Sequence, residues 1–141
     1  MKTTLPIEIF PIEDDGYHLK ITLFINGKPA RMILDTGASR TVFDETRIVN
    51  FVDEDCLELQ NRLSTGLGTN SMESKQVVLD DLQIGGIMIT DYNAAVLDLA
   101  HVNKSYERLE IEAIDGVLGG DILNDYKAVI DYDKKELVLF N

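Results

Sequence analysis

Apolar and polar residues alternate over short stretches along most of the chain. Residues 7–13 and 17–27 alternate in this way on either side of Asp14-Asp15-Gly16, which predicts a β-hairpin. Asn26-Gly27 lies at the end of the second stretch and suits the positive φ angles of a type I′ turn. Residues 30–35 continue the pattern, so the first part of the chain predicts three strands joined by tight turns.

The middle of the chain predicts further strands, with one ambiguous segment. Residues 41–52 begin like a short strand and continue like an irregular helical turn, and the pattern does not decide between them. Residues 57–86 favour two strands around a glycine-bearing tip at 64–71. Gly85-Gly86 then predicts a turn into another strand that ends near residue 98.

The last part of the chain mixes helical and strand spacing. Apolar residues at 99, 102, 106 and 109 have the spacing of a helix, and residues 119–126 favour a second short helix. Residues 127–132 and 136–141 predict two strands around a turn at 133–135. Many short strands with Gly and Asn turns indicate a mainly β barrel or sandwich that carries minor helices.

Composition narrows the classes of function. The 141 residues contain no repeat and no linker, so residues 1–141 are interpreted as a single domain. A formal net charge of −12 favours solubility, and it disfavours nucleic-acid binding because it repels phosphate backbones. The single cysteine, Cys56, has no partner for an intrachain disulfide, and two histidines alone disfavour a zinc site.

The sequence predicts neither a membrane span nor a signal peptide. The longest uninterrupted apolar runs have about five residues, far fewer than the roughly twenty that cross a bilayer. Residues 1–16 lack an apolar segment followed by a small-residue cleavage site. We therefore expect a cytoplasmic protein without a membrane partner, unless a signal has been trimmed from the chain.

The stretch Asp35-Thr36-Gly37-Ala38 carries the candidate chemistry. Asp35 ends an apolar strand, although a carboxylate is costly to bury without partners. Gly37 permits a tight turn, and Thr36 offers a hydroxyl that both donates and accepts. This pattern predicts a carboxylate on a loop that a rigid strand supports from behind. The alternative is a buried turn aspartate that caps its own backbone.

A second motif lies later in the chain, where Gly116-Val117-Leu118-Gly119 precedes a short helical stretch. With both motifs in this order, the chain resembles the retropepsin-type aspartic proteases, the single-domain relatives of the pepsins. Residues 17–35 match the hairpin and strand that lead to the catalytic loop, and Asp35-Thr36-Gly37 matches the family signature. Residues 64–71 stand where a flap tip is expected. The pattern is most like that of the small bacterial members.

This resemblance implies a retropepsin-like acid-protease barrel with short helices near residues 101–110 and 120–126. It also implies an aspartic endopeptidase, in which two carboxylates share one proton. The ionised carboxylate activates a water, and the protonated one donates to the developing oxyanion, as aspartic proteases in general do. The chain has one Asp-Thr-Gly, so a homodimer must bring two Asp35 side chains together.

The resemblance assigns further site residues by position, and it implies a peptide or protein substrate, no metal and no cofactor. Thr36 of each chain is expected to hydrogen-bond across the dimer axis. The remaining assignments are support of the catalytic loop by Thr36, Gly37 and Ala38, flap contacts by Thr65, Gly66, Leu67 and Gly68, and packing behind the loop by Val117, Leu118 and Gly119.

The sequence departs from the retroviral pattern beside the catalytic loop. Retroviral members carry an acid after Thr-Gly-Ala and Arg-Asn after the later glycine, whereas this chain has Ser39 and Gly120-Asp121. One hypothesis is a substitute ion pair between Arg40 and Asp121. The alternative is that Asp121 is the N-cap of the short helix. His18 lies in an alternating strand and is interpreted as an exposed polar residue.

Two rival functions and one structural expectation remain. The chain could be a catalytically silent peptide-binding or dimerisation module with the retropepsin fold, or a monomer that pairs with a different Asp-Thr-Gly chain. The strand at 136–141 is apolar, and left as an unpaired edge it would be an aggregation hazard. Retropepsins relieve this by interleaving chain termini in the dimer, and we expect a similar arrangement here.

Overall fold

The computed structural model describes residues 1–53 and 75–141. The flap candidate at 64–71 and the strand expected before it therefore lie outside the described residues. In chain order the elements are β1 (Lys2–Pro6), β2 (Glu8–Pro11), β3 (Tyr17–Ile25), β4 (Lys28–Leu34), β5 (Val42–Asp44), the 3-10 helix η1 (Ile48–Asn50), β6 (Lys75–Ile84), β7 (Ile87–Leu97), α2 (Ala100–Arg108), β8 (Gly116–Leu118), α3 (Gly120–Asp125), β9 (Val129–Asp131) and β10 (Glu136–Phe140).

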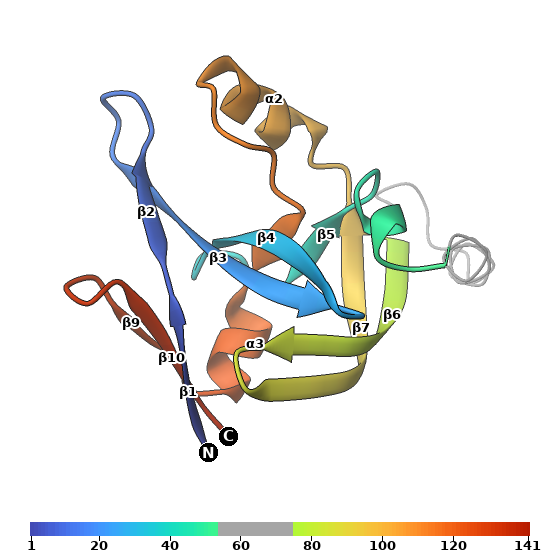
Figure 1. Ribbon diagram of the computed structural model, residues 1–141. Helices are drawn as coiled ribbons and strands as arrows, with labels where there is room; N and C mark the ends of the chain where they lie inside the picture. The colour runs from blue at the N-terminus through green and yellow to red at the C-terminus, as the bar shows by residue number, and fades with distance from the viewer. Residues whose placement is uncertain (54–74) are drawn as a thin grey trace.

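The larger sheet closes on itself as a barrel. Its strand order is β2-β3-β4-β8-β5-β7-β6, and an additional pairing of β6 with β3 closes the strands from β3 to β6 into a ring (Figure 1). Alternate residues of β3, among them Leu19, Ile21 and Leu23, are buried in the interior. The predicted mainly β architecture with short helices is thus confirmed.

The tight turns have the conformations that the sequence predicts. Asn26 and Gly27 join β3 to β4 with φ angles of 50° and 82°, as a type I′ turn requires. Residues 12–16, which include the predicted turn Asp14-Asp15-Gly16, join β2 to β3. The ambiguous segment 41–52 contains both features that the pattern allows, since the strand β5 precedes η1.

The two chain ends pair with each other in a separate small sheet. Its order is β1-β10-β9, with Lys2 opposite Phe140 and Leu5 opposite Leu137 (Figure 1). The strand at 136–141 is therefore not an open edge within one chain, because β10 lies between two neighbours of its own chain. The expected interleaving of chain ends between two subunits stays a prediction. The sequence pattern missed β1, in which only Leu5 is buried. The edges of this sheet are β1 and β9.

Helix α2 covers a second, smaller core outside the barrel. Phe10 of β2, Ile33 of β4, Tyr106 of α2 and Ile114 pack together there. The main core fills the barrel and continues under the terminal sheet through Leu137 and Leu139. Within the described part of the chain, no helix is long and apolar enough to cross a membrane.

Candidate active site

Asp35 emerges from the barrel at the end of a central strand. β4 pairs in parallel with β8, with Leu34 opposite Leu118. The ladder extends one step further, because the Asp35 backbone N–H donates to the Leu118 carbonyl at 3.1 Å. Leu34 and Leu118 are buried, whereas Asp35 is exposed. A buried strand pair thus holds the backbone of an exposed carboxylate, which is the arrangement that the sequence predicts.

The loop after Asp35 folds back on the carboxylate. The Gly37 backbone N–H donates to Asp35 Oδ1 at 2.8 Å, and the Ala38 N–H donates to the Asp35 carbonyl at 3.2 Å. Thr36 and Gly37 are exposed. Among the described residues, no other group hydrogen-bonds the Asp35 carboxylate. It is therefore anchored by one oxygen and keeps the other available for chemistry.

The glycines after β8 allow a very close approach to this loop. A Cβ at Gly119 would lie 2.6 Å from the Arg40 carbonyl oxygen and 2.8 Å from that of Ala38. The Gly120 N–H donates to the Ala38 carbonyl at 2.7 Å. The structure thus brings Gly119 and Gly120 directly against the loop.

Asp121 braces the loop in a way that neither sequence hypothesis describes. Its Oδ1 accepts from both the backbone N–H and the hydroxyl of Thr41, each at 2.8 Å, and its Oδ2 accepts a short hydrogen bond from the Tyr92 hydroxyl. Thr41 Oγ1 in turn accepts from the Gly119 N–H at 3.0 Å. This network joins β7, α3 and the end of the candidate catalytic loop.

Both hypotheses for Asp121 are therefore wrong. The Arg40 guanidinium donates to the Asn93 carbonyl at 2.8 Å. Among the described residues, Arg40 and Asp121 form no ion pair. The N-cap of α3 is Gly119, and Asp121 belongs to the first turn. Tyr92 and Thr41 already donate hydrogen bonds to both oxygens of the Asp121 carboxylate. Neither an ion pair nor a capping role is therefore needed to satisfy its hydrogen-bonding capacity.

Electrostatics at Asp121 favour the ionised carboxylate. Burial alone raises its pKa, but hydrogen bonds from Tyr92, Thr41 and the backbone more than offset burial and hold the pKa below its ordinary value of 3.8. For Tyr92, burial and the bond to Asp121 raise the pKa of the phenol, so it stays protonated and remains a donor.

A cavity of about 430 Å³ opens beside Asp35. Leu19 of β3, Val117 of β8 and Ile130 of β9 contribute apolar surface to it, and Asp35 and Thr36 lie at its wall. A substrate group seated here would lie next to the exposed carboxylate. An apolar cavity with a few polar groups is the usual form of a small-molecule or side-chain binding site.

Two residues at this cavity were not predicted to contribute to the site. Tyr106 of α2 is buried and its hydroxyl hydrogen-bonds His18 Nδ1 of β3 at 2.7 Å. Burial first, and then the negative charge of Asp35, raises the pKa of the Tyr106 phenol. His18 is exposed, as expected, but its alternating strand position gave no signal of a helix partner 88 residues away.

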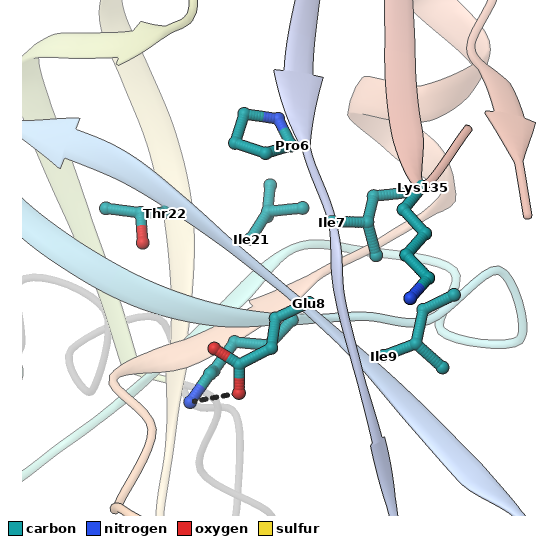
Figure 2. A pocket seen from close by; sticks show the side chains of 8 residues that line it. Pro6, Ile7, Glu8, Ile9, Ile21, Thr22 and Lys135 are labelled. Carbon is teal, nitrogen blue, oxygen red and sulfur yellow. Dashed lines mark ion pairs between the residues drawn. The ribbon is translucent and has the colours of Figure 1, made fainter.

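A second cavity, of about 490 Å³, lies where the segment between β1 and β2 passes over β3 (Figure 2). Its charged groups are Glu8, which pairs with Lys20 at 3.5 Å, and Lys135. None of the site residues expected from the sequence lines this cavity. The carboxylate of this cavity is already paired with a lysine, whereas Asp35 has no ion-pair partner among the described residues, so the Asp35 cavity is the candidate active site.

The expected residues of the catalytic loop and of β8 lie together, and the flap candidates are not among the described residues. Asp35, Thr36, Gly37, Ala38, Val117, Leu118 and Gly119 meet at one place in the structure. The flap candidates Thr65, Gly66, Leu67 and Gly68 lie outside the described residues. Within residues 1–53 and 75–141, no three His, Cys, Asp or Glu side chains are grouped so that they could hold a metal ion.

A comparison of the sequence with models of known protein families finds a match that covers the candidate active site. A family model described as aspartyl protease matches residues 21–122, which include Asp35 and Gly119. The chain belongs to the aspartyl protease family. No curated protein matches it significantly.

Two solved structures show that this member of the aspartyl protease family has the retropepsin-like fold. One is a retropepsin-like aspartic protease from Rickettsia conorii, with 22% identity, a TM-score of 0.54, and coverage of 99% of this chain and 89% of that chain. The other is the retroviral protease-like domain of Ddi1 from Leishmania major, with 16% identity, a TM-score of 0.59, and coverage of 88% and 89%. The resemblance to the retropepsin-type aspartic proteases and the predicted retropepsin-like barrel are thus confirmed.

Proposed function

We propose that the protein is an aspartic endopeptidase and that its active site forms between two copies of the chain. The observation that carries the proposal is the single exposed carboxylate of Asp35, held by one backbone N–H at the end of a buried strand. Proton-sharing chemistry needs a second carboxylate close by. The one Asp-Thr-Gly of the sequence assigns that second carboxylate to Asp35 of the partner subunit.

In the proposed mechanism the two Asp35 carboxyl groups hold one proton between them. The ionised group removes a proton from a water, which attacks the peptide carbonyl carbon, while the other group protonates the carbonyl oxygen. The tetrahedral intermediate then collapses: the Asp35 that took the water proton gives it to the nitrogen, the C–N bond breaks to release an amine, and the other Asp35 takes back a hydroxyl proton as the carboxylic acid forms. Thr36 is proposed to tie the two loops together, and residues 65–68 to act as the flap. No metal or cofactor is required.

The surface near the cavity supports a second copy as the partner. β9 is an edge strand of the terminal sheet, and its neighbourhood carries two exposed apolar residues, Val129 (50% exposed) and Tyr132 (62%). Ile130 and Tyr132 also line the Asp35 cavity. A chain that pairs along this edge would lie beside the carboxylate, and it would cover backbone groups that an edge strand leaves unpaired.

The test compares the wild type with Asp35→Asn on a peptide library between pH 4 and pH 8. We expect the wild type to cleave peptides and Asp35→Asn to lose at least about 10²- to 10⁴-fold in kcat/KM, because it removes the acid–base group. Circular dichroism serves as the control that the variant is folded. If the wild type cleaves nothing in this range, the chain is better described as a silent binding or dimerisation module.

Mixing the two proteins tests the shared site separately. If each active dimer needs two intact Asp35 residues, activity falls with the square of the wild-type fraction when subunits exchange at constant total concentration. Two independent monomer sites would instead give a linear fall. Sedimentation of the wild type distinguishes a homodimer from a monomer that awaits a different chain.

A further inference from the structure

His18 lies on the same face of the barrel sheet as Asp35. β3 and β4 are antiparallel, with Lys20 opposite Ile33. His18 stands two residues before Lys20 and Asp35 two residues after Ile33, so the alternation of side chains directs both toward one face. Both residues line the same cavity, and both are exposed. A charge on the imidazole therefore acts in the cavity that also holds the carboxylate.

Tyr106 of α2 holds this imidazole in place. Its hydroxyl is hydrogen-bonded to His18 Nδ1 at 2.7 Å, and the two rings pack edge-to-face with 5.8 Å between centroids. Phe10 packs against the imidazole in the same geometry, at 6.0 Å. Tyr106 is 4% exposed, and burial together with the charge of Asp35 raises the pKa of its phenol. The Tyr106 hydroxyl therefore keeps its hydrogen at neutral and acidic pH.

The direction of this hydrogen bond depends on the charge of the imidazole. A neutral imidazole can accept at Nδ1 from the Tyr106 hydroxyl while its own hydrogen is on Nε2. A cationic imidazole carries hydrogen on both nitrogens, so His18 Nδ1 must then donate and the Tyr106 oxygen must accept. Imidazole side chains in general change charge between about pH 5 and pH 8. Acidification thus places a positive charge in the cavity and frees the Tyr106 hydrogen for another acceptor.

The cavity contains few other charges that could act on Asp35. Among the described residues that line it, His18 is the one base and Asp35 the one acid, and the remaining titratable groups are the phenols of Tyr17, Tyr106 and Tyr132. Next to His18 on β3, Lys20 is paired with Glu8 of β2 at 3.5 Å. Other charged or titratable residues of the β2–β3 turn and of α2 are exposed and do not line the cavity: Glu13, Asp14, Asp15, His101, Lys104, Glu107 and Arg108.

Resting on the proposed function, we propose that His18 is a positioning residue whose protonated imidazole keeps one carboxylate of the Asp35 pair ionised as the pH falls. Opposite charges in one cavity favour the charged form of both groups. The ionised carboxylate is the base that activates the water. A protein with a charged His18 should therefore remain active at lower pH than one in which residue 18 cannot become charged.

The first test is the pH profile of kcat/KM for the wild type and His18→Gln. Glutamine keeps a polar side chain that can hydrogen-bond Tyr106, but it cannot become charged. We expect the acid limb of the profile to lie about 0.5 pH unit higher in His18→Gln, which is about a threefold loss of kcat/KM on that limb. His101→Gln is the matched control. It removes the other histidine of the chain, which is exposed on α2 outside the cavity, and should keep the wild-type profile.

The second test does not depend on turnover. Electrostatic coupling between two sites is reciprocal, so the charge of Asp35 must also favour the protonated imidazole. Nitrogen NMR of the histidine rings follows the pH at which His18 Nδ1 gains its hydrogen. We expect this step to occur at lower pH in Asp35→Asn than in the wild type, whereas the step of His101 should not move.

The two tests separate this inference from the proposed function. If the wild type cleaves nothing at any pH but the His18 step still moves in Asp35→Asn, the proposed activity fails and the link between His18 and Asp35 stands. A His18 step at the same pH in both proteins would overturn the inference. Coinciding acid limbs of kcat/KM for the wild type and His18→Gln would do the same.

Discussion

Asp35 and Asp121 follow two neighbouring parallel strands, but their surroundings are opposite. Asp35 directly follows β4, is exposed, and accepts one backbone hydrogen bond within the described residues. Asp121 lies three residues after β8 and accepts from the Thr41 backbone, the Thr41 hydroxyl and the Tyr92 hydroxyl. The first carboxylate is left open and the second is used as a structural brace.

This difference indicates how one barrel edge provides both rigidity and reactivity. A carboxylate saturated with hydrogen bonds stays ionised and has no lone pair left for a substrate water. Asp121 is such a carboxylate, and its hydrogen bonds fix the position of Thr41. The Thr41 hydroxyl in turn accepts from the Gly119 N–H behind the loop. Asp35 can then stay open without loosening the loop that carries it.

The largest effect that separates the two residues should be on stability. Asp121→Ala leaves the fully buried Thr41 and the Tyr92 hydroxyl without their acceptor, so we expect a loss of about 2 to 3 kcal/mol in the free energy of unfolding. Asp35→Ala should change that free energy by no more than about 0.5 kcal/mol, because its side chain is exposed. Urea unfolding at one protein concentration measures both, and equal losses would contradict the contrast.

A smaller loss is expected from removing one donor of the brace. Tyr92→Phe deletes the hydroxyl that donates to Asp121 and keeps the ring, so stability should fall by about 1.5 kcal/mol, as for a hydrogen bond to a charged group. Tyr17→Phe is the matched control, since Tyr17 is 68% exposed and should give no measurable change. If the two variants unfold at the same urea concentration, Tyr92 does not contribute to the brace.

Most of the fold follows from local sequence signals. The alternating residues of β3 and the Asn26-Gly27 turn were predictable because strand burial and positive φ are properties of a few adjacent residues. Strand β1 was not predictable from the sequence, since four of its five residues are not buried. Its place is set by pairing with β10 at the other end of the chain. Contacts of that sequence separation leave no local pattern.

The candidate site divides in the same way. Asp35 could be found because a carboxylate at the end of an apolar strand is unusual in itself, and the later Gly116-Val117-Leu118-Gly119 supports it. The hydrogen-bond partners of Asp121 could not be found from the sequence. Charge pairing favoured Arg40, whereas in the structure the partners are the buried Thr41 and Tyr92 of β7. Likewise, nothing local links His18 to Tyr106.

The smallest expected effect is the pH dependence of the brace. Hydrogen bonds hold the pKa of Asp121 below its ordinary value in the folded protein, whereas in the unfolded chain the carboxyl titrates at that ordinary value. The folded state therefore binds fewer protons at this group, and its contribution is complete above the unfolded pKa and is lost as pH falls through the folded pKa. The stability difference between wild type and Asp121→Asn should thus be constant from pH 7 to pH 5 and shrink below pH 4. Because the other carboxylates titrate in both proteins, the subtraction isolates Asp121, and a difference that stays constant down to pH 2 would show that its hydrogen bonds do not favour the ionised form.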